Sequence, residues 1–364
     1  MGPKSASTTS PRRRGRPTSK ETTTTSTKTV AVPKSKDIAV AETSCFDSAL
    51  KFTLLTASSL LLSSALFSLS IPITKGDLAW TSKRLDTWKD VVALLSWRVL
   101  ELGIPWFSGY DAWDVSCFIG LIHLPTYSLL LNFYNIRPTT ILTVAAITTL
   151  SCTIPFSYFR PLSAAHSGGV TTANRAILSD RLTTIYTTVA STLVYTLVLY
   201  LSFATWLPVH LVTYFTGLPD ISAAHAGAKG FLSLFLSLLP AGYGTRDLLF
   251  VTSASQPQEK KIEKKTTRRR LRSADSQVEE DLQEDSCIAS LYKKAWLGLS
   301  PNLRVLISRS AVLALMTLAN TFVQLGGTIN GVEPKGALGW GATWSLATLI
   351  NAALYGWIQE ANGR

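Results

Sequence analysis

The sequence is poor in charged residues: 16% of its 364 residues are Asp, Glu, Lys or Arg, whereas 46% are hydrophobic. A soluble domain carries roughly 25% charged residues, so the composition disfavours a soluble globular protein. Cysteine is scarce as well, and the four cysteines lie far apart without paired spacing. This spacing predicts neither a disulfide framework nor a zinc knuckle. Asn-x-Ser/Thr sequons are absent from the chain, so no lumenal surface is marked by a glycosylation site.

Catalytic motifs are also missing. The sequence has no phosphate-binding glycine loop, no His-Glu-x-x-His and no Gly-x-Ser-x-Gly. The best carboxylate pair is Asp111 and Asp114, which would allow a membrane-embedded lipid enzyme that uses a divalent cation. However, an aspartate at this position also caps a helix that begins near Val115, and capping is the favoured interpretation. We therefore expect no metal, no cofactor and no catalytic residue, and an enzyme is the least favoured class.

Long apolar runs are what the sequence does contain. Each run has about the length of a membrane-spanning helix, and the charged residues gather outside them. The pattern predicts an all-α polytopic membrane protein with about eight transmembrane helices. The eight runs cover about 52–73, 91–107, 115–134, 139–158, 183–208, 230–251, 305–327 and 337–358.

The run at 91–107 decides the number of spans, because Arg98 and Glu101 stand near its middle. An arginine at the bilayer centre costs roughly 2.5 to 3.5 kcal/mol, but a spacing of three places both residues on one helix face, where they can pair. If this run lies in the interface, seven spans remain. Counting it as a span places both termini and the central charged segment on the cytosolic or nucleoplasmic side, as the positive-inside rule favours. Eight spans are the prediction.

Composition divides the chain into five segments. The polar segments are too poor in large apolar side chains to form a core, so we predict that they are mostly disordered. The predicted segments are a basic Ser/Thr/Pro-rich tail at 1–44, a first membrane block of about six spans at 45–251, a charged cytosolic loop at 252–304, a two-helix membrane block at 305–358 and a short tail at 359–364.

The first segment contains a short basic motif, whose residues are Arg12, Arg13, Arg14, Gly15, Arg16 and Pro17. The core Arg14-Gly15-Arg16-Pro17 resembles an AT-hook; the membrane region resembles no family. The resemblance implies that Arg14 and Arg16 lie in the minor groove of AT-rich DNA, with Arg12, Arg13 and Lys20 on phosphates. A narrow groove attracts arginine, and glycine lets the backbone approach its floor. The alternative is a basic tail that sets orientation or binds anionic lipid headgroups.

A second basic cluster stands in the central loop and would add contacts to DNA or to anionic lipid. Its members are Lys260, Lys261, Lys264, Lys265, Arg268, Arg269, Arg270 and Arg272. Prolines and a glycine in the amino-terminal tail disfavour a mitochondrial transit helix. The endoplasmic reticulum or nuclear envelope is therefore expected in preference to the mitochondrion or plasma membrane.

These features favour a structural or tethering membrane protein. The alternative is a transporter or channel in which Arg98, Glu101 and His123 line a path, because ionisable residues inside a membrane often mark one. The last apolar run also has small residues at helical spacing, which allow close helix packing. We expect this stripe to pack within the chain, with a partner helix as the other possibility; it includes Ala337, Gly341 and Ser345.

Overall fold

The computed structural model describes residues 36–163, 165–166, 180–255, 296 and 298–362. The chain separates into two units, residues 1–48 and 49–364, and the arrangement given below is that of the second unit. Among the described residues there are two isolated β-bridges and no β-strand. The prediction of an all-helical fold is therefore confirmed for this part of the chain.

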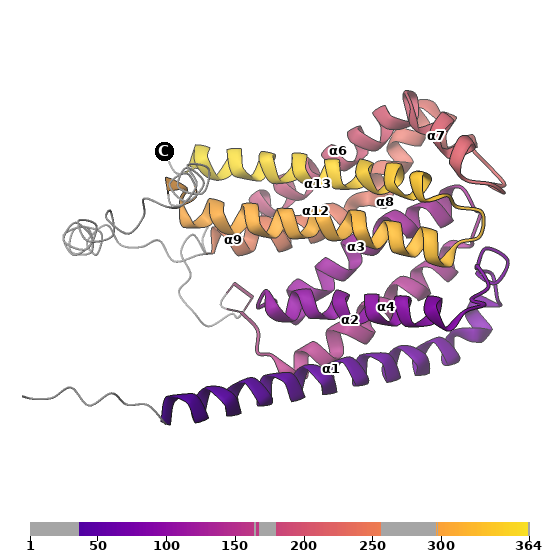
Figure 1. Ribbon diagram of the computed structural model, residues 1–364. Helices are drawn as coiled ribbons and strands as arrows, with labels where there is room; N and C mark the ends of the chain where they lie inside the picture. Colours follow the sequence, from indigo (N-terminus) through magenta and orange to yellow (C-terminus); the bar gives the residue numbers. More distant parts are fainter. Residues whose placement is uncertain (1–35, 164, 167–179, 256–295, 297, 363–364) are drawn as a thin grey trace, which may run out of the picture. The chain divides into compact units, whose positions relative to one another are not determined.

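The helices follow one another with short connections (Figure 1). The first half of the chain contains α1 (Lys36–Thr74), α2 (Trp88–Phe107), α3 (Ala112–Asn132) and α4 (Pro138–Phe159). The middle contains α6 (Arg181–Ala204), α7 (Leu207–Tyr214), η1 (Ser222–His225), α8 (Gly227–Thr245), the π-helical η2 (Arg246–Val251) and α9 (Thr252–Ala254). The last two helices are α12 (Pro301–Thr328) and α13 (Pro334–Asn362). Helix α1 thus begins within the segment predicted to be a tail.

Among the described residues, five helices are long and apolar enough to cross a membrane, judged by length and composition. They are Asp47–Thr74 of α1, together with α3, α4, α6 and α12. The prediction of eight spans is not supported. The run at 91–107 forms α2, whose charged residues lower its hydropathy, and the run at 230–251 is divided between α8 and η2. The run at 337–358 forms α13, in which glycine and polar residues replace long aliphatic side chains.

Successive long helices run in alternating directions between two ends, to the right and to the left in Figure 1. We call the right-hand one the hairpin end; it holds the connections 75–87, 133–137, 205–226 and 329–333. Backbone hydrogen bonds join these connections: Lys83 N–H donates to Thr328 O over 2.7 Å, and Thr216 N–H donates to Gly331 O over 2.8 Å. Gly331 has φ +78° and lies so close to Thr216 that a Cβ would stand 2.4 Å from its carbonyl oxygen. Only glycine fits this turn.

The opposite end, which we call the charged end, holds the connections 108–111 and 160–166 and the segment 246–255. Arg160 ties the first two of these together by donating to the carbonyl oxygens of Tyr110 and Trp106 over 3.1 and 3.0 Å. Gln359, near the end of α13, donates to Ser253 Oγ over 2.6 Å. The two ends of the unit are thus each closed by contacts between segments far apart in sequence.

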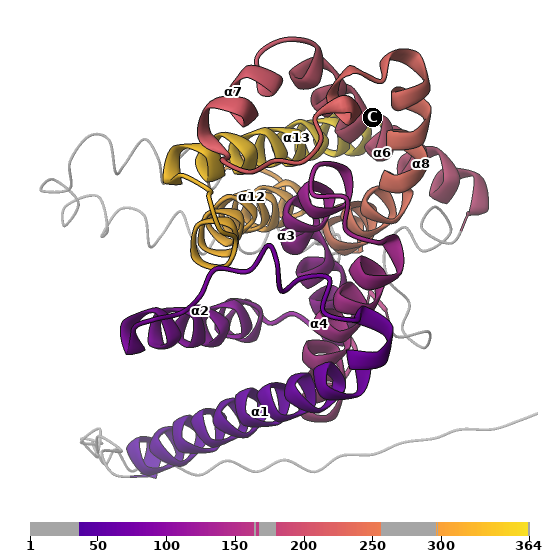
Figure 2. The same ribbon diagram turned by 90° about the vertical axis from the view of Figure 1, so that its right-hand side faces the viewer.

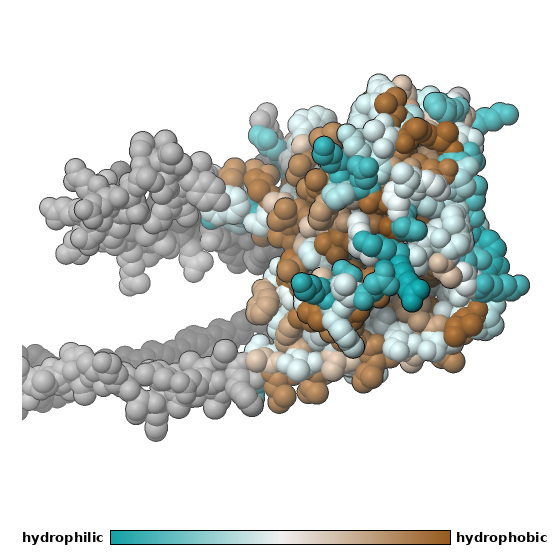
Figure 3. Space-filling view, turned by 45° about the vertical axis from the view of Figure 1, so that its right-hand side comes forward, coloured by the Kyte–Doolittle hydropathy of each residue, from teal (hydrophilic) through white to brown (hydrophobic). Residues whose placement is uncertain are grey.

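The interior is packed with large side chains, and the outer faces of the helices are also apolar. Trp340, Trp344 and Tyr355 of α13 are fully buried. By contrast, Leu61 of α1 and Leu182 of α6 are 74% and 75% exposed. Figure 2 shows α1 and α2 beside the helices grouped around α3, and Figure 3 shows apolar residues over much of the flank, with hydrophilic ones gathered toward the hairpin end. Exposure of such large apolar faces to water is unfavourable, whereas lipid chains would cover them.

The small residues of α13 pack against α12. A Cβ on Gly341 would stand 3.2 Å from side-chain atoms of Leu318 and Thr321. Ser345 Oγ donates to Ala314 O over 2.8 Å, and Ala337 is fully buried. The expectation that this stripe packs within the chain is confirmed.

Candidate functional site: two buried charge clusters

The two basic tracts predicted from the sequence lie outside the described residues. This applies to the AT-hook-like motif, Arg12 to Pro17, and to the basic cluster from Lys260 to Arg272. Lys20 also lies outside the described residues. The remaining ionisable residues singled out from the sequence are described, and they fall into two clusters within the helical unit.

The first cluster joins Arg98, Glu101 and His123, which the structure brings together. Arg98 Nη1 lies 2.7 Å from Glu101 Oε2, so the spacing of three on α2 does form an ion pair. His123 of α3 places Nδ1 3.3 Å from the other oxygen of the same carboxylate. The Glu101 side chain is 1% exposed. A buried acid is therefore faced by a cation and an imidazole, as burial of a charge requires.

Further contacts tie this first cluster to α4. Arg98 Nη2 donates to Ser151 Oγ over 3.2 Å and to Cys152 Sγ over 3.0 Å. His123 Nδ1 also lies 3.1 Å from Ile119 O, one turn earlier in α3. Its ring stacks on Tyr127 with centroids 5.8 Å apart. The cluster thus links α2, α3 and α4, and its chemistry is that of a cross-link within the helical core.

The second cluster begins with Asp111 at the start of α3. Asp111 has extended backbone angles, φ −87° and ψ 177°, and its Oδ1 accepts the backbone N–H of Asp114 over 2.8 Å. This is the geometry of a helix N-cap. The capping role expected from the sequence is confirmed.

The other carboxylate oxygen of Asp111 holds the connection 160–166. It accepts the backbone N–H of Ser163 over 2.8 Å and lies 2.8 Å from His166 Nδ1. Burial alone would raise the pKa of Asp111, but the His166 hydrogen bond and two backbone N–H groups outweigh it, so the pKa lies well below its ordinary value. Burial alone would lower the pKa of His166, but the carboxylate of Asp111 outweighs it and raises the pKa. Each partner favours the charged form of the other.

Asp114 is paired with Arg309 of α12 across the core. Arg309 Nη1 and Nη2 each lie 2.9 Å from one oxygen of Asp114, which is a bidentate contact. Arg309 Nη1 also donates to Leu248 O over 3.2 Å. The guanidinium carbon stands 4.4 Å from the centre of the Tyr110 ring. Arginine suits this position because its planar fork matches a carboxylate and stacks on an aromatic face.

The π-helical segment η2 adds a third acid to the second cluster. Arg246 Nη1 lies 3.1 Å from Asp247 Oδ1, and Arg246 Nη2 donates to Thr184 Oγ1 over 2.9 Å. The indole N–H of Trp113 donates to Asp247 Oδ2. Single π-helical turns occur frequently at functional sites. Thr252, directly after the turn, reaches the pair formed by Asp114 and Arg309: its Oγ1 donates to Asp114 Oδ1 over 3.3 Å and accepts from Arg309 Nη1 over 3.3 Å.

The second cluster has the composition of an ion-pair network. Ligand atoms of Asp111, Asp114 and His166 lie within 4.8 Å of one another, close enough to share a metal ion. However, Arg309 already occupies both oxygens of Asp114, and His166 faces Asp111. Arg309 and His166 thus offset the negative charge of Asp114 and Asp111, which would otherwise attract a divalent ion. Cross-linking of α3, α12 and the connection 160–166 is the chemistry that the geometry favours.

Sequence reasoning missed Arg309 and gave Arg246 and Asp247 no role. Arg309 stands in an otherwise apolar run, one turn from its charged end, and Asp114 stands at the same depth in α3. A charged residue in such a run needs an opposite charge. This signal points to a pairing in the core, although it does not identify the partner.

Comparison with known proteins gives a family for part of the chain. Residues 180–323 match the family described as the bouquet formation protein 3 C-terminal domain. The matched segment runs from the start of α6 into α12 and includes Arg246, Asp247 and Arg309. It covers less than half of the chain, and it corrects the expectation that the membrane region resembles no family. No curated protein and no solved structure matches the chain.

Proposed function

We propose that the protein is a structural or tethering membrane protein of the nuclear envelope whose basic segments contact DNA or anionic lipid. The observation that carries the proposal is the match of residues 180–323 to a family named for bouquet formation. We take a bouquet to be an arrangement of chromosomes at the nuclear envelope. A protein with that role needs a membrane anchor and a segment that reaches chromatin.

The helical unit supplies features of an anchor. In the part of the chain that the structure describes, five helices have the length and composition to cross a bilayer, and large side chains such as Leu61 and Leu182 are exposed on the outside. The ionisable groups of the core are paired with one another. Membrane proteins have both apolar outer faces and paired charges in the core. Acyl chains cover the apolar faces but cannot stabilise a charge, so a charge within the membrane needs a partner from the protein.

Within the second unit, the described segments nearest in sequence to the two basic tracts lie at one end. Helix α1 reaches the hairpin end at Thr74, so its residues near Ala49 point toward the charged end (Figure 1). Helix α9, which precedes the central segment in sequence, and the start of α12, which follows it, lie at that same end (Figure 1). We propose that this end faces the cytosol or nucleoplasm, as an excess of Lys and Arg favours. The AT-hook-like motif and the central basic cluster would then act on one partner together.

DNA binding by the tail is tested with the full-length protein in nanodiscs. We expect it to bind an AT-rich duplex more tightly than a GC-rich one at physiological salt, and Arg14→Ala with Arg16→Ala to remove the preference. Lys28→Ala with Lys34→Ala is the matched control, because it removes the same charge elsewhere in the tail and should weaken both duplexes alike. Equal binding of the two duplexes by the wild type would leave contact with anionic lipid as the role of the tail.

A transporter or channel is the second candidate function. It is favoured by the meeting of Arg98, Glu101 and His123 inside the helical unit, since such residues often line ion pathways. Their mutual pairing also fits a structural cross-link. Replacing Arg98 and Glu101 together by leucine separates the two functions, because only a transporter would lose flux.

A further inference from the structure

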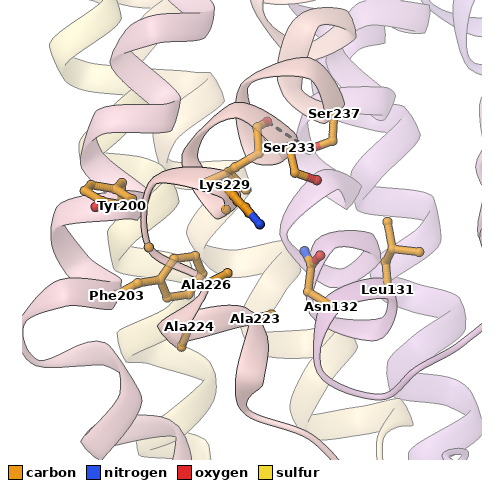
Figure 4. A pocket seen from close by; sticks show the side chains of 13 residues that line it. Leu131, Asn132, Tyr200, Phe203, Ala223, Ala224, Ala226, Lys229, Ser233 and Ser237 are labelled. Atoms are coloured by element: carbon orange, nitrogen blue, oxygen red, sulfur yellow. Dashed lines mark hydrogen bonds between the residues drawn. The ribbon is translucent and has the colours of Figure 1, made fainter.

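A cavity of about 360 Å³ lies at the hairpin end, away from both charge clusters. Its walls come from the last turns of α3 and α6, from η1 and from the first turns of α8 (Figure 4). Lys229, Ala226 and Gly227 are exposed on its rim, so the cavity can be reached from outside. Its volume lies at the lower end of the range of small-molecule sites.

One side of the cavity is polar and carries a single positive charge. The ammonium group of Lys229 points into it, and Asn132 and Ser233 stand around it (Figure 4). Of the described residues that line the cavity, none is acidic. No ion pair of Lys229 occurs within the described ranges. Asp220, an acid nearby in sequence, accepts hydrogen bonds from the N–H and hydroxyl of Ser222 instead.

The cavity also has an apolar lining, formed by Leu131, Phe203 and Leu234. On α8, Leu232 and Leu236 are 60% and 57% exposed on the outside of the unit. A ligand that matches this lining has an anionic group joined to an apolar part.

We propose that this cavity binds the phosphate headgroup of an anionic phospholipid. Lys229 pairs with the phosphate, Asn132 and Ser233 hydrogen-bond to its oxygens, and the start of an acyl chain lies against Leu131 and Phe203. Charge-assisted hydrogen bonds of this kind are stronger than neutral ones. The site rests on the membrane part of the proposed function. It does not involve the AT-hook-like motif or the central basic cluster.

The test is a titration of the full-length protein with dioleoylphosphatidic acid, followed by native mass spectrometry from phosphatidylcholine nanodiscs. We expect one tightly held lipid per chain. Lys229→Ala should weaken its binding about tenfold or more, as loss of a hydrogen bond between charged groups predicts. Ser233→Trp keeps the charge but fills the cavity and should weaken it as much. Lys335→Ala removes a lysine at the same end outside the cavity and should leave the tight site unchanged.

Each other outcome overturns the proposal. Equal loss with Lys335→Ala, or no loss with Ser233→Trp, would assign the binding to surface charge. Equal retention of phosphatidylcholine would remove the need for an anionic group, and equally tight binding of glycerol 3-phosphate would point to a soluble phosphate ligand. All variants keep both basic tracts, so these contribute the same background. They should also remain in the membrane with unchanged thermal stability, which separates failure of this site from failure of the proposed function.

Discussion

Loss of Arg309 tests the second charge cluster most sharply. Arg309 makes two 2.9 Å contacts with Asp114, and the side chains are 12% and 1% exposed. Arg309→Met keeps most of the aliphatic length and removes the charge. Asp114 would then remain buried without its cation, and breaking a buried pair in this way costs about 3 to 5 kcal/mol. We expect the free energy of unfolding to fall by about that amount.

The assay is unfolding of the purified protein in one detergent, followed by circular dichroism. Arg84→Met is the matched control, because Arg84 pairs with Asp86 where the side chains are 91% and 73% exposed, and exposed pairs contribute little. Asp114→Leu combined with Arg309→Leu should be much less harmful than Arg309→Met, since no charge is left unpaired. The reasoning would be refuted if Arg309→Met were as mild as Arg84→Met, or if the double variant were as unstable as the single one.

Three further predictions concern the pH dependence of stability, the ion pair of Arg98 and Glu101, and the close helix packing at Gly242. The pKa of His166 is raised, so its contribution to stability is present below its ordinary pKa of 6.5 and is lost as the pH rises through the folded value. The pKa of Asp111 is lowered, so its contribution to stability is present above its ordinary pKa of 3.8 and is lost as the pH falls through the folded value. His166→Ala should therefore flatten the loss of stability on the alkaline side in thermal melts, and an unchanged profile would exclude this pairing. Arg98→Leu with Glu101→Leu should preserve the fold and location, and it should abolish flux if the protein is a transporter. Arg98→Leu alone should destabilise the protein, because the buried Glu101 carboxylate would lose its cation. Gly242→Val should prevent stable folding, since a Cβ there would stand 2.8 Å from the backbone of α6; a melting temperature equal to that of the wild type would contradict this close approach.

Some features could be predicted because their causes are local in sequence. Asp111 precedes an apolar run, and a short acidic side chain in that place accepts the free N–H groups of the first helical turn. Arg98 and Glu101 are three residues apart, so any helix places them on one face. The stripe of Ala337, Gly341 and Ser345 follows from helical periodicity and the small size of its residues. Each of these arrangements depends on the helix alone.

Other features depend on tertiary contacts. Arg309 and Asp114 are 195 residues apart, and their pairing follows from the packing of α12 beside α3. The cavity with Lys229 exists because three helices and η1 meet at one end. The π-helical turn at Arg246 divides an apolar run that the sequence presents as continuous. Counting apolar runs therefore predicted eight spans, whereas five helices of the described ranges meet the requirements of both length and composition.

We predict an integral protein of the nuclear envelope, and one combined measurement tests this location directly. Membranes from cells that express the tagged full-length chain are extracted with alkaline carbonate, and the same cells are labelled with immunogold for electron microscopy. The chain should remain in the membrane pellet, and the gold should lie along the nuclear envelope. Release into the supernatant would contradict the membrane assignment, and gold confined to other membranes would contradict the proposed location and tethering role.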